Sequence, residues 1–270
     1  MTREAEVLER YRDAISQTEQ ISMYPFVMES QDGAVMRGAN GDEAIDFFAA
    51  WAVGSTGYRH PTVVSRLEDQ LEKGYTNSPI TVPHEPVVEL AERLRDRFDA
   101  DFETKVWIGH AGSDAGDLVA RAVPKMGAGD TIVSFEGSYH GGLQGSAAIS
   151  GHSAQADAAA EGVVSLPFPY PYRADDPERE RDDILEAAKD AFETHDVAGV
   201  VTEPLQSDGG IRVPPDGFIE GLADLCRDHD AYFVIDEVKA GLGRTGEFWA
   251  FEHADIRPDA RGEDHREILL

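Results

Sequence analysis

Two adjacent acids, Asp236 and Glu237, stand between the apolar run AYFVI and the glycine-rich segment GLGRTG (241–246). The glycines fit the G-x-G-x-x-G pattern that cradles a dinucleotide pyrophosphate at the start of a helix. A dinucleotide loop normally forms the first turn of a βαβ unit, whereas this segment comes late and is followed by the aromatic stretch EFWAF. The acids would also repel a pyrophosphate. A nicotinamide-dependent dehydrogenase is therefore disfavoured, and the glycines fit a plain turn.

The first acid, Asp236, is the better candidate for chemistry. The carboxyl end of a buried parallel strand is where open α/β sheets bind their ligands. One ligand that needs an acid there is pyridoxal phosphate (PLP), because a carboxylate beside its pyridine nitrogen keeps that nitrogen protonated and makes the ring an electron sink. Other loops would then have to supply groups for the phosphate and for the faces of the ring.

Two earlier loops carry groups of that kind. AGSDA (111–115) is a small-residue turn at a predicted helix N-terminus, where free N–H groups bind phosphate and the Ser113 hydroxyl adds a donor. An ordinary helix cap explains that segment equally well. GSYHGG (137–142) offers Tyr139, which can stack on an aromatic ring, and His140, either a partner of another polar group or simply a satisfied polar residue. Taken alone, this segment fits a surface loop.

A third loop, TEPLQSDGG (202–210), places the acids Glu203 and Asp208 and the amide of Gln206 after another apolar run. The carboxyl ends of parallel strands meet at one edge of a sheet, so these loops are expected to converge. Their joint occurrence is a stronger signal than any single segment.

The elements that must position these loops alternate along the chain. Apolar spacing predicts amphipathic helices at about 4–20, 61–74, 85–98, 114–123, 182–196 and 218–230. Pro124 should end or kink the fourth of them. Short apolar runs predict strands at 105–109, 131–135, 198–201 and 231–238, after short β segments within 27–48 and with a polar, proline-rich connection at about 151–181. This alternation predicts an α/β fold with a mostly parallel sheet covered on both faces.

The composition excludes several classes of partner. The chain has 24 Lys and Arg against 52 Asp and Glu, a net charge of −28, which disfavours nucleic acid and anionic membrane. Many acids and only five lysines resemble the cytoplasmic proteins of salt-loving microbes. Cys226 is the only cysteine, so an intrachain disulfide and a cysteine metal cluster are excluded, and no metal is expected. Without a secretory signal or a long apolar run, the protein is expected to be soluble and cytoplasmic.

In order and spacing, the motifs resemble those of the class III aminotransferases, PLP-dependent enzymes of fold type I that include ornithine, acetylornithine and 4-aminobutyrate transaminases. The matching segments are GYRHP (57–61), AGSDA (111–115), SYHG (138–141), EPLQSDGG (203–210) and DEVKAGLGRTG (236–246). The resemblance extends to about Asp259 and is most specific in the last two segments. It implies a PLP-dependent large domain over 61–259, preceded by an N-terminal segment over 1–60.

The resemblance also assigns roles around the cofactor. Gly112 and Ser113 would bind its phosphate, and Tyr139 would stack on the pyridine ring. Asp236 would pair with the pyridine nitrogen, while Val238 would pack on the opposite face of the ring.

Four further residues complete the site that the resemblance implies. Glu203 would support the site from behind, and His140 is counted with the cofactor-binding residues, its role as a partner or a satisfied polar residue still open. Lys239 stands where the family often has a glutamine near the phenolic oxygen of PLP. That oxygen is an anion, so the ammonium of a lysine could also pair with it. Asp208 matches an acid that pairs with a substrate-switching arginine in several members.

The tail departs from the resemblance. The family continues past Pro-Asp into an apolar strand and a Gly-Lys step, whose lysine forms the Schiff base with PLP. Here Pro258-Asp259 is followed by the polar ARGEDHREILL without lysine, and the counterpart position falls at or near His265. No catalytic residue is therefore assigned, and Lys239 is a poor substitute because its position aims it at the oxygen edge of the ring. The tail over 260–270 suggests a frameshifted gene, an absent C-terminal small domain and an unpaired sheet edge.

The expected function is amino-group transfer from an amino or ω-amino acid to a 2-oxo acid, in a chain that is inactive alone. An amino-acid racemase or epimerase of the same family shares every motif and remains an alternative. A non-catalytic PLP-binding remnant is the alternative from a different class. A homodimer is expected if the chain folds.

Overall fold

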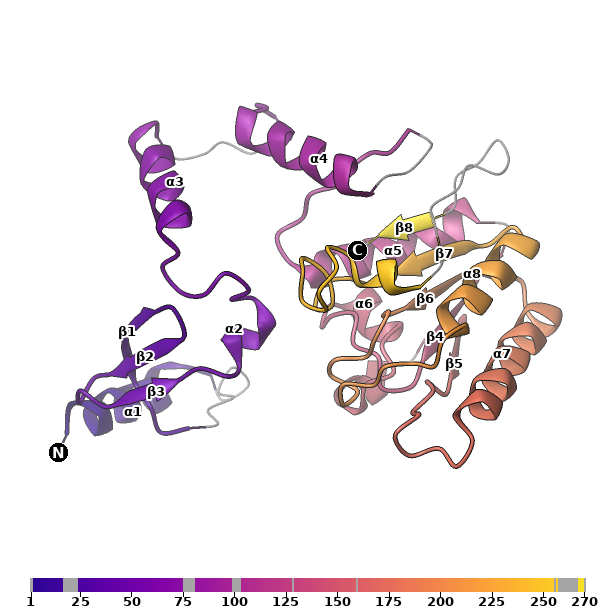
Figure 1. Cartoon of the computed structure of the whole chain (residues 1–270), viewed down its shortest axis with the longest axis horizontal. Helices are drawn as coiled ribbons and strands as arrows, with labels where there is room; N and C mark the ends of the chain where they lie inside the picture. Colours follow the sequence, from indigo (N-terminus) through magenta and orange to yellow (C-terminus); the bar gives the residue numbers. More distant parts are fainter. Residues whose placement is uncertain are drawn as a thin grey trace. The chain divides into compact units, whose positions relative to one another are not determined.

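The computed structural model describes residues 2–16, 24–74, 81–98, 103–127, 129–158, 160–254, 256 and 267–269 (Figure 1). They form two compact units, residues 1–82 and 83–270, and each unit is described by itself. The domain limits inferred from the sequence stay a prediction. None of the helices described is long and apolar enough to cross a membrane.

The first unit joins a small antiparallel sheet to three helices. The strands β1 (Met28–Asp32), β2 (Val35–Gly38) and β3 (Glu43–Ile45) pair in sequence order. Gly33, in the left-handed region at φ 57°, lies between the first two strands. The helices are α1 (Arg3–Ala14), α2 (Ala49–Ala52) and α3 (Pro61–Glu72). Pro61 begins α3, where its missing N–H would have no partner within the helix anyway.

The second unit is built on a parallel sheet of five strands in the order β5-β4-β6-β7-β8. The strands are β4 (Thr131–Phe135), β5 (Val163–Leu166), β6 (Val197–Thr202), β7 (Tyr232–Ile235) and β8 (Glu267–Leu269). All residues of β4 and β6 are buried, which explains their continuous apolar sequence. The predicted α/β fold with a parallel sheet is confirmed.

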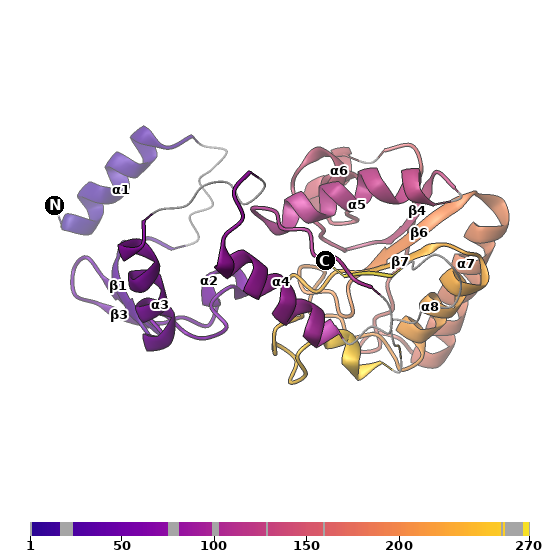
Figure 2. The same ribbon diagram turned by 90° about the horizontal axis from the view of Figure 1, so that it is seen from above.

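Helices cover both faces of this sheet (Figure 2). On one face lie α5 (Gly112–Met126) and α6 (Gln144–Ala148), and on the other α7 (Pro177–Thr194) and α8 (Phe218–Asp228). The alternation of side chains along β4 divides the core, because Ile132 packs with Val119 and Val123 of α5, whereas Phe135 packs with Phe218 of α8. The remaining elements are α4 (Glu85–Phe98) and the 3₁₀ helices η2 (Ser153–Ala158) and η3 (Ala250–His253).

Two sequence-based expectations about these elements were wrong, and a third was tested only in part. Residues 105–109 form no strand, and Trp107 and Ile108 are exposed, because no strand of the described chain lies beside them to complete their hydrogen bonds. The connection at 151–181 contains β5, an edge strand that the flanking prolines concealed. Pro124 does not end α5, since the helix runs two residues further, to Met126, while the expected kink stays a prediction.

The tail also differs from expectation in part. β8 pairs in parallel with β7, Phe233 opposite Glu267 and Ile235 opposite Leu269, so the edge of β7 is paired over these residues. The expected unpaired edge is therefore wrong there. His265, the expected counterpart of the family's lysine, lies outside the described residues.

Candidate functional site

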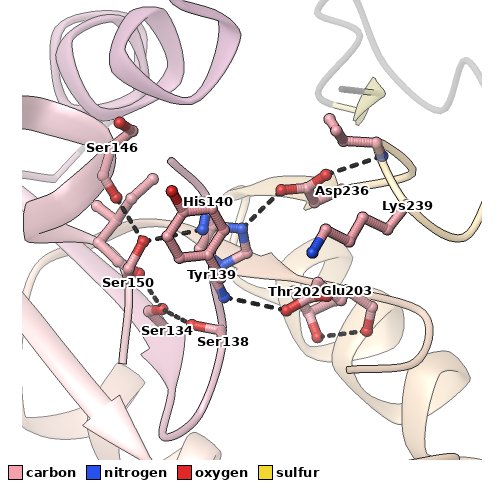
Figure 3. A network of polar contacts seen from close by, with 12 residues as sticks. Ser134, Ser138, Tyr139, His140, Ser146, Ser150, Thr202, Glu203, Asp236 and Lys239 are labelled. Carbon is pink, nitrogen blue, oxygen red and sulfur yellow. Dashed lines mark hydrogen bonds and ion pairs between the residues drawn. The ribbon is translucent and has the colours of Figure 1, made fainter. Parts of the chain in front are cut away.

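The polar loops that follow β4, β6 and β7 meet at the carboxyl edge of the sheet (Figure 3), and the N-terminus of α5 is bonded to the first of them through Ser113. Hydrogen bonds connect these segments. Nδ1 of His140 lies 2.8 Å from Asp236, the Tyr139 N–H donates to Glu203 at 3.1 Å, and the Gly142 N–H donates to Ser113 at 3.1 Å. The convergence expected from the sequence follows from the parallel direction of the strands.

The carboxylate of Asp236 is buried and oriented by two donors. Its Oδ2 accepts from Nδ1 of His140, and its Oδ1 accepts from the N–H of Val238 at 3.0 Å. The His140 side chain is fully buried, and its Nε2 atom has no hydrogen-bond partner among the described residues. The segment at the end of α6 holds this histidine, because its N–H donates to the Ser150 hydroxyl at 2.9 Å, which in turn donates to Ser146 O of α6 at 2.7 Å. An acid held in this way presents a fixed negative charge at the end of β7.

Glu203 connects the loop after β4 to the loop after β6. Its Oε1 accepts from the Tyr139 N–H and its Oε2 from the Ser207 N–H at 3.2 Å. Burial raises the pKa of Glu203 to about 7, the negative charge of Asp236 adds to this rise, and His140 opposes it. Glu203 therefore fixes the backbone on either side of the site and carries a proton more readily than an exposed glutamate.

Lys239 and Asp208 form an ion pair at the mouth of the site, with Nζ and Oδ2 2.5 Å apart. Both side chains are 21% exposed. The Lys239 ammonium also lies over the Tyr139 ring, 5.9 Å from its centroid, so Lys239 extends into the space beside that ring (Figure 3).

Two glycines bring the N-terminus of α5 close to the other loops. A Cβ at Gly112 would lie 3.0 Å from Val238 Cγ1, and a Cβ at Gly141 would lie 2.7 Å from the Ser113 Cα. Larger side chains would therefore push the helix N-terminus away from the loops after β4 and β7. The Asp114 N–H already donates to Ala111 O at 3.0 Å, so the N–H groups of Gly112 and Ser113 in the first turn of α5, together with the Ser113 hydroxyl, form a site suited to an anion.

Glu237 points away from this site and has a structural role that the sequence did not reveal. Its two oxygens accept from the N–H groups of Ala250 and Phe251, both at 2.8 Å, at the start of η3. Burial raises its pKa, and these two hydrogen bonds oppose that rise. The glycines at 241–246 form turns that lead into this 3₁₀ helix rather than an α-helix, which agrees with the choice of a plain turn.

The nine residues singled out at these loops are all brought to one edge of the sheet: Gly112, Ser113, Tyr139, His140, Glu203, Asp208, Asp236, Val238 and Lys239. Ser146 and Ser150 were missed, because small polar residues without a distinctive spacing give no signal in a single sequence. Among the described residues, no group of His, Cys, Asp and Glu could hold a metal ion.

A family model described as "Aminotransferase class-III" matches residues 16–261. The chain belongs to the class III aminotransferase family. Among curated relatives, isoleucine 2-epimerase of Lentilactobacillus buchneri is 34% identical over 251 residues, which cover 88% of this chain and 56% of the relative. Acetylornithine aminotransferase of Methanopyrus kandleri is 31% identical over 240 residues, 88% of this chain and 58% of the relative.

The solved structures agree with this class III assignment. Taurine:2-oxoglutarate aminotransferase from Bifidobacterium kashiwanohense, solved with PLP and glutamate, aligns with a TM-score of 0.87 and 25% identity, over 97% of this chain and 62% of that one. The fold is thus that of the fold-type-I aminotransferases. The chain spans less than two thirds of the length of these relatives.

Proposed function

We propose that this class III chain binds PLP at the carboxyl edge of its sheet. The observation that carries the proposal is the buried Asp236–His140 pair, which holds a fixed carboxylate beside an aromatic side chain and a helix N-terminus. These residues fit PLP. Gly112 lies close to Val238 and Gly141 lies close to Ser113, so the first turn of α5 faces the space beside the Asp236 carboxylate.

Each residue has a task in this proposal. Asp236 keeps a proton on the pyridine nitrogen, and His140 holds Asp236 in place. Tyr139 and Val238 contact the two faces of the ring, while Ser113 and the N–H groups around Gly112 bind the phosphate. When bound, PLP supplies an electron sink that stabilises negative charge at the α-carbon of an amino acid.

Glu203 and Lys239 complete the site. Glu203 accepts a hydrogen bond from the backbone N–H of Tyr139 and so fixes the position of the Tyr139 ring that faces the cofactor. Lys239 offers its ammonium to the phenolic oxygen of PLP, and its three N–H donors allow it to hold Asp208 at the same time.

The reaction class that we propose is amino-group transfer between an amino or ω-amino acid and a 2-oxo acid. Most of the relatives support it, among them the acetylornithine and 5-aminovalerate aminotransferases. Inversion of the α-carbon of an amino acid is the second candidate, because an isoleucine 2-epimerase is 34% identical and an alanine/serine racemase of Pyrococcus horikoshii is 29% identical. Both reactions use the same loops.

We further propose that the 270-residue chain is inactive by itself. Its lysines stand at 73, 105, 125, 189 and 239, so Lys239 is the only lysine in the sequence after β7. Lys239 is held by Asp208 at 2.5 Å, and an ammonium paired with a carboxylate is a poor nucleophile. Without a basic amine beside the cofactor, proton transfer at the α-carbon loses the base that this reaction class uses. The chain is then a PLP-binding protein, expected as a homodimer in the cytoplasm.

A single preparation tests these proposals. The purified chain is titrated with PLP, followed by absorbance, then reduced with borohydride and digested for mass spectrometry. We expect saturable binding and no pyridoxyl-lysine at any position. Failure to bind PLP would contradict the cofactor proposal, whereas a stoichiometric adduct on Lys239 would contradict the proposed inactivity and call for chiral and transaminase assays.

A further inference from the structure

Two arginines outside the proposed cofactor site share one aromatic ring. The guanidinium carbon of Arg212 lies over the Tyr170 ring, 5.0 Å from its centroid, and that of Arg173 lies 5.5 Å from the same centroid. Tyr170 comes after β5 and Arg212 after β6, and both strands are neighbours of β4 in the sheet. Because the three strands are parallel, the segments that follow them lie at the carboxyl edge of the sheet.

The backbone holds both arginines in place. Arg212 exchanges backbone hydrogen bonds of 2.9 and 3.0 Å with Gln206, at the base of the turn after β6. Its side chain reaches the loop after β4, since a Cβ at Gly137 would lie 3.6 Å from Arg212 Nη1. The Arg173 N–H donates to Tyr170 O at 2.9 Å. This tight turn at 170–173 folds the Arg173 side chain back onto the tyrosine ring.

Neither guanidinium has an acceptor among the described residues. They form no ion pair and no hydrogen bond there, and the buried Nε of Arg212 has no partner. The Tyr170 hydroxyl likewise makes no hydrogen bond with any residue that the structure describes. Two acids that follow in the sequence, Asp176 and Glu180, accept backbone N–H groups instead. Three donor groups thus gather at one ring without an acceptor in the described part of the chain.

Arginines without a carboxylate partner are unexpected in this chain, because acids outnumber the cations by 52 to 24. At the start of α7, Arg179 pairs with Asp183 at 3.7 Å and Arg181 pairs with Asp182 at 2.8 Å. The two arginines at the Tyr170 ring have no such pair among the described residues, and their like charges repel each other. An anionic ligand beside the ring would satisfy both arginines and remove this repulsion.

We propose that Arg173, Arg212 and the Tyr170 hydroxyl bind a phosphate dianion, either free phosphate or the phosphate of a small ester. Guanidinium groups bind phosphate oxygens through two parallel hydrogen bonds. A phosphate ester offers three terminal oxygens, one for each donor group, and at pH 8 it carries close to two negative charges, which match two arginines. A carboxylate offers only two oxygens and one charge. The site uses none of the residues proposed for PLP, so it does not rest on the proposed function.

The test is a calorimetric titration of the 270-residue chain at pH 8 and fixed ionic strength, with and without saturating PLP. The probes are methyl phosphate, inorganic phosphate and acetate. We expect both phosphates to bind, and acetate to bind at least about tenfold more weakly because it brings one charge instead of two. Tighter binding of methyl phosphate than of inorganic phosphate would assign the site to an ester, and the reverse order would assign it to free phosphate. Equal affinity for acetate and the phosphates would overturn the proposed ligand class.

Substitutions at the ring locate the binding. Arg212→Met and Arg173→Met should each weaken methyl phosphate binding by about tenfold or more, because each removes charge-assisted hydrogen bonds. Arg212→Lys should have an intermediate affinity, since it keeps the charge and loses the planar fork. Tyr170→Phe keeps the ring, loses the hydroxyl and should bind about threefold more weakly. Arg93→Met removes the charge of an exposed arginine that pairs with Glu89 on α4, so this matched control should bind like the unchanged chain.

A further variant separates this site from the first turn of α5, where phosphate can also bind. Ser113→Ala and saturating PLP should both leave the affinity for methyl phosphate unchanged. Equal affinity in Arg212→Met and Arg93→Met would overturn the proposal, as would a loss confined to Ser113→Ala. If the arginines only cover the tyrosine ring, Arg212→Met lowers the urea midpoint and leaves phosphate binding unaltered, which also overturns it. Absence of PLP binding together with the expected losses in the arginine variants would reject the cofactor proposal and leave this site standing.

Discussion

The backbone N–H of Tyr139 donates to the buried carboxylate of Glu203 at 3.1 Å, so the residue that presents an aromatic ring to the site is fixed by an acid that ionises with difficulty. The same carboxylate holds the Ser207 N–H. Two loops that come from different strands, β4 and β6, thus share one charge, and its protonation links the stability of the fold to pH.

Glu203 should make the folded protein less stable as the pH rises through the range from 4.5 to 7. Burial raises its pKa to about 7 from 4.5, so the folded protein keeps a proton that the unfolded chain releases. The contribution is fully present below pH 4.5 and is lost by pH 7, a difference of about 3 kcal/mol. Glu203→Gln has no carboxyl to titrate. Its free energy of unfolding should therefore rise relative to the unchanged chain by that amount between pH 4.5 and 8.

Urea unfolding at several pH values measures this difference. Glu193→Gln, at an exposed position on α7, is the matched control and should run parallel to the unchanged chain. Parallel curves for Glu203→Gln as well would show that Glu203 does not hold the additional proton.

Asp236→Asn should weaken PLP binding more than it weakens the fold. The amide keeps the size of the side chain but loses the charge that would hold a proton on the pyridine nitrogen. Hydrogen bonds to charged groups contribute about 1.5–3 kcal/mol, so the dissociation constant for PLP should rise roughly 10- to 100-fold. An absorbance titration measures it, with the exposed Asp183→Asn on α7 as the control. Unchanged affinity would remove Asp236 from the site.

His140 is expected to act through Asp236 rather than on the cofactor. Its Nδ1 orients the carboxylate at 2.8 Å, and groups that hold a ligand-binding residue usually contribute about tenfold in affinity. His140→Ala should weaken PLP binding by about that factor in the unchanged background. In the Asp236→Asn background it should have much less effect, because there is no charge left to orient. Equal effects in both backgrounds would indicate an independent role for His140.

The sequence predicted the convergence of the site better than it predicted the edges of the sheet. Asp236, Tyr139 and Glu203 follow apolar strands, and parallel strands bring their carboxyl ends to one edge whatever their exact register. Edge segments lack such redundancy. β5 is short and flanked by proline, and the apolar run at 105–109 finds no neighbour among the described residues.

The pairing of individual side chains was harder to predict from the sequence than the edge segments were. Lys239 and Asp208 are 31 residues apart, and only the rotamer of the lysine decides whether it meets Asp208 or the oxygen edge of a cofactor. Glu237 was recognised as an acid of the strand end, but it accepts from Ala250 and Phe251, whereas its neighbour Asp236 bonds to His140. Both acids lie just beyond β7, which ends at Ile235, so the regular alternation of a strand does not decide which of them enters the site.

Glu237→Ala should destabilise the fold and leave PLP binding intact, the opposite of Asp236→Asn. Both oxygens of Glu237 accept backbone N–H groups at the start of η3, and the side chain is buried. Removing the acceptor leaves the N–H groups of Ala250 and Phe251 buried without a partner, which costs about 3 kcal/mol. Urea unfolding at pH 8 measures the loss, and a PLP titration below the unfolding transition provides the contrast. A large loss of PLP affinity in the folded variant would contradict this separation of roles.

Gly141 and Gly243 allow a test of how tightly the N-terminus of α5 is held against the loop after β4. Both have left-handed backbones, with φ of 130° and 84°, so alanine at either position carries a conformational cost of about 1 kcal/mol. Only at Gly141 would the Cβ also clash, lying 2.7 Å from the Ser113 Cα, whereas nothing lies within 4 Å at Gly243. Gly141→Ala should therefore cost about 2 kcal/mol more than Gly243→Ala in urea unfolding.

The same pair of variants reports on the site. The clash at Gly141 pushes against Ser113, whose hydroxyl accepts from the Gly142 N–H at 3.1 Å, so the first turn of α5 must shift. Gly141→Ala should then bind PLP more weakly, by about tenfold or more, because the phosphate loses aligned N–H donors. Gly243→Ala should bind it normally. If both variants lose the same stability and bind PLP equally, the close contact between Ser113 and Gly141 does not shape the anion site.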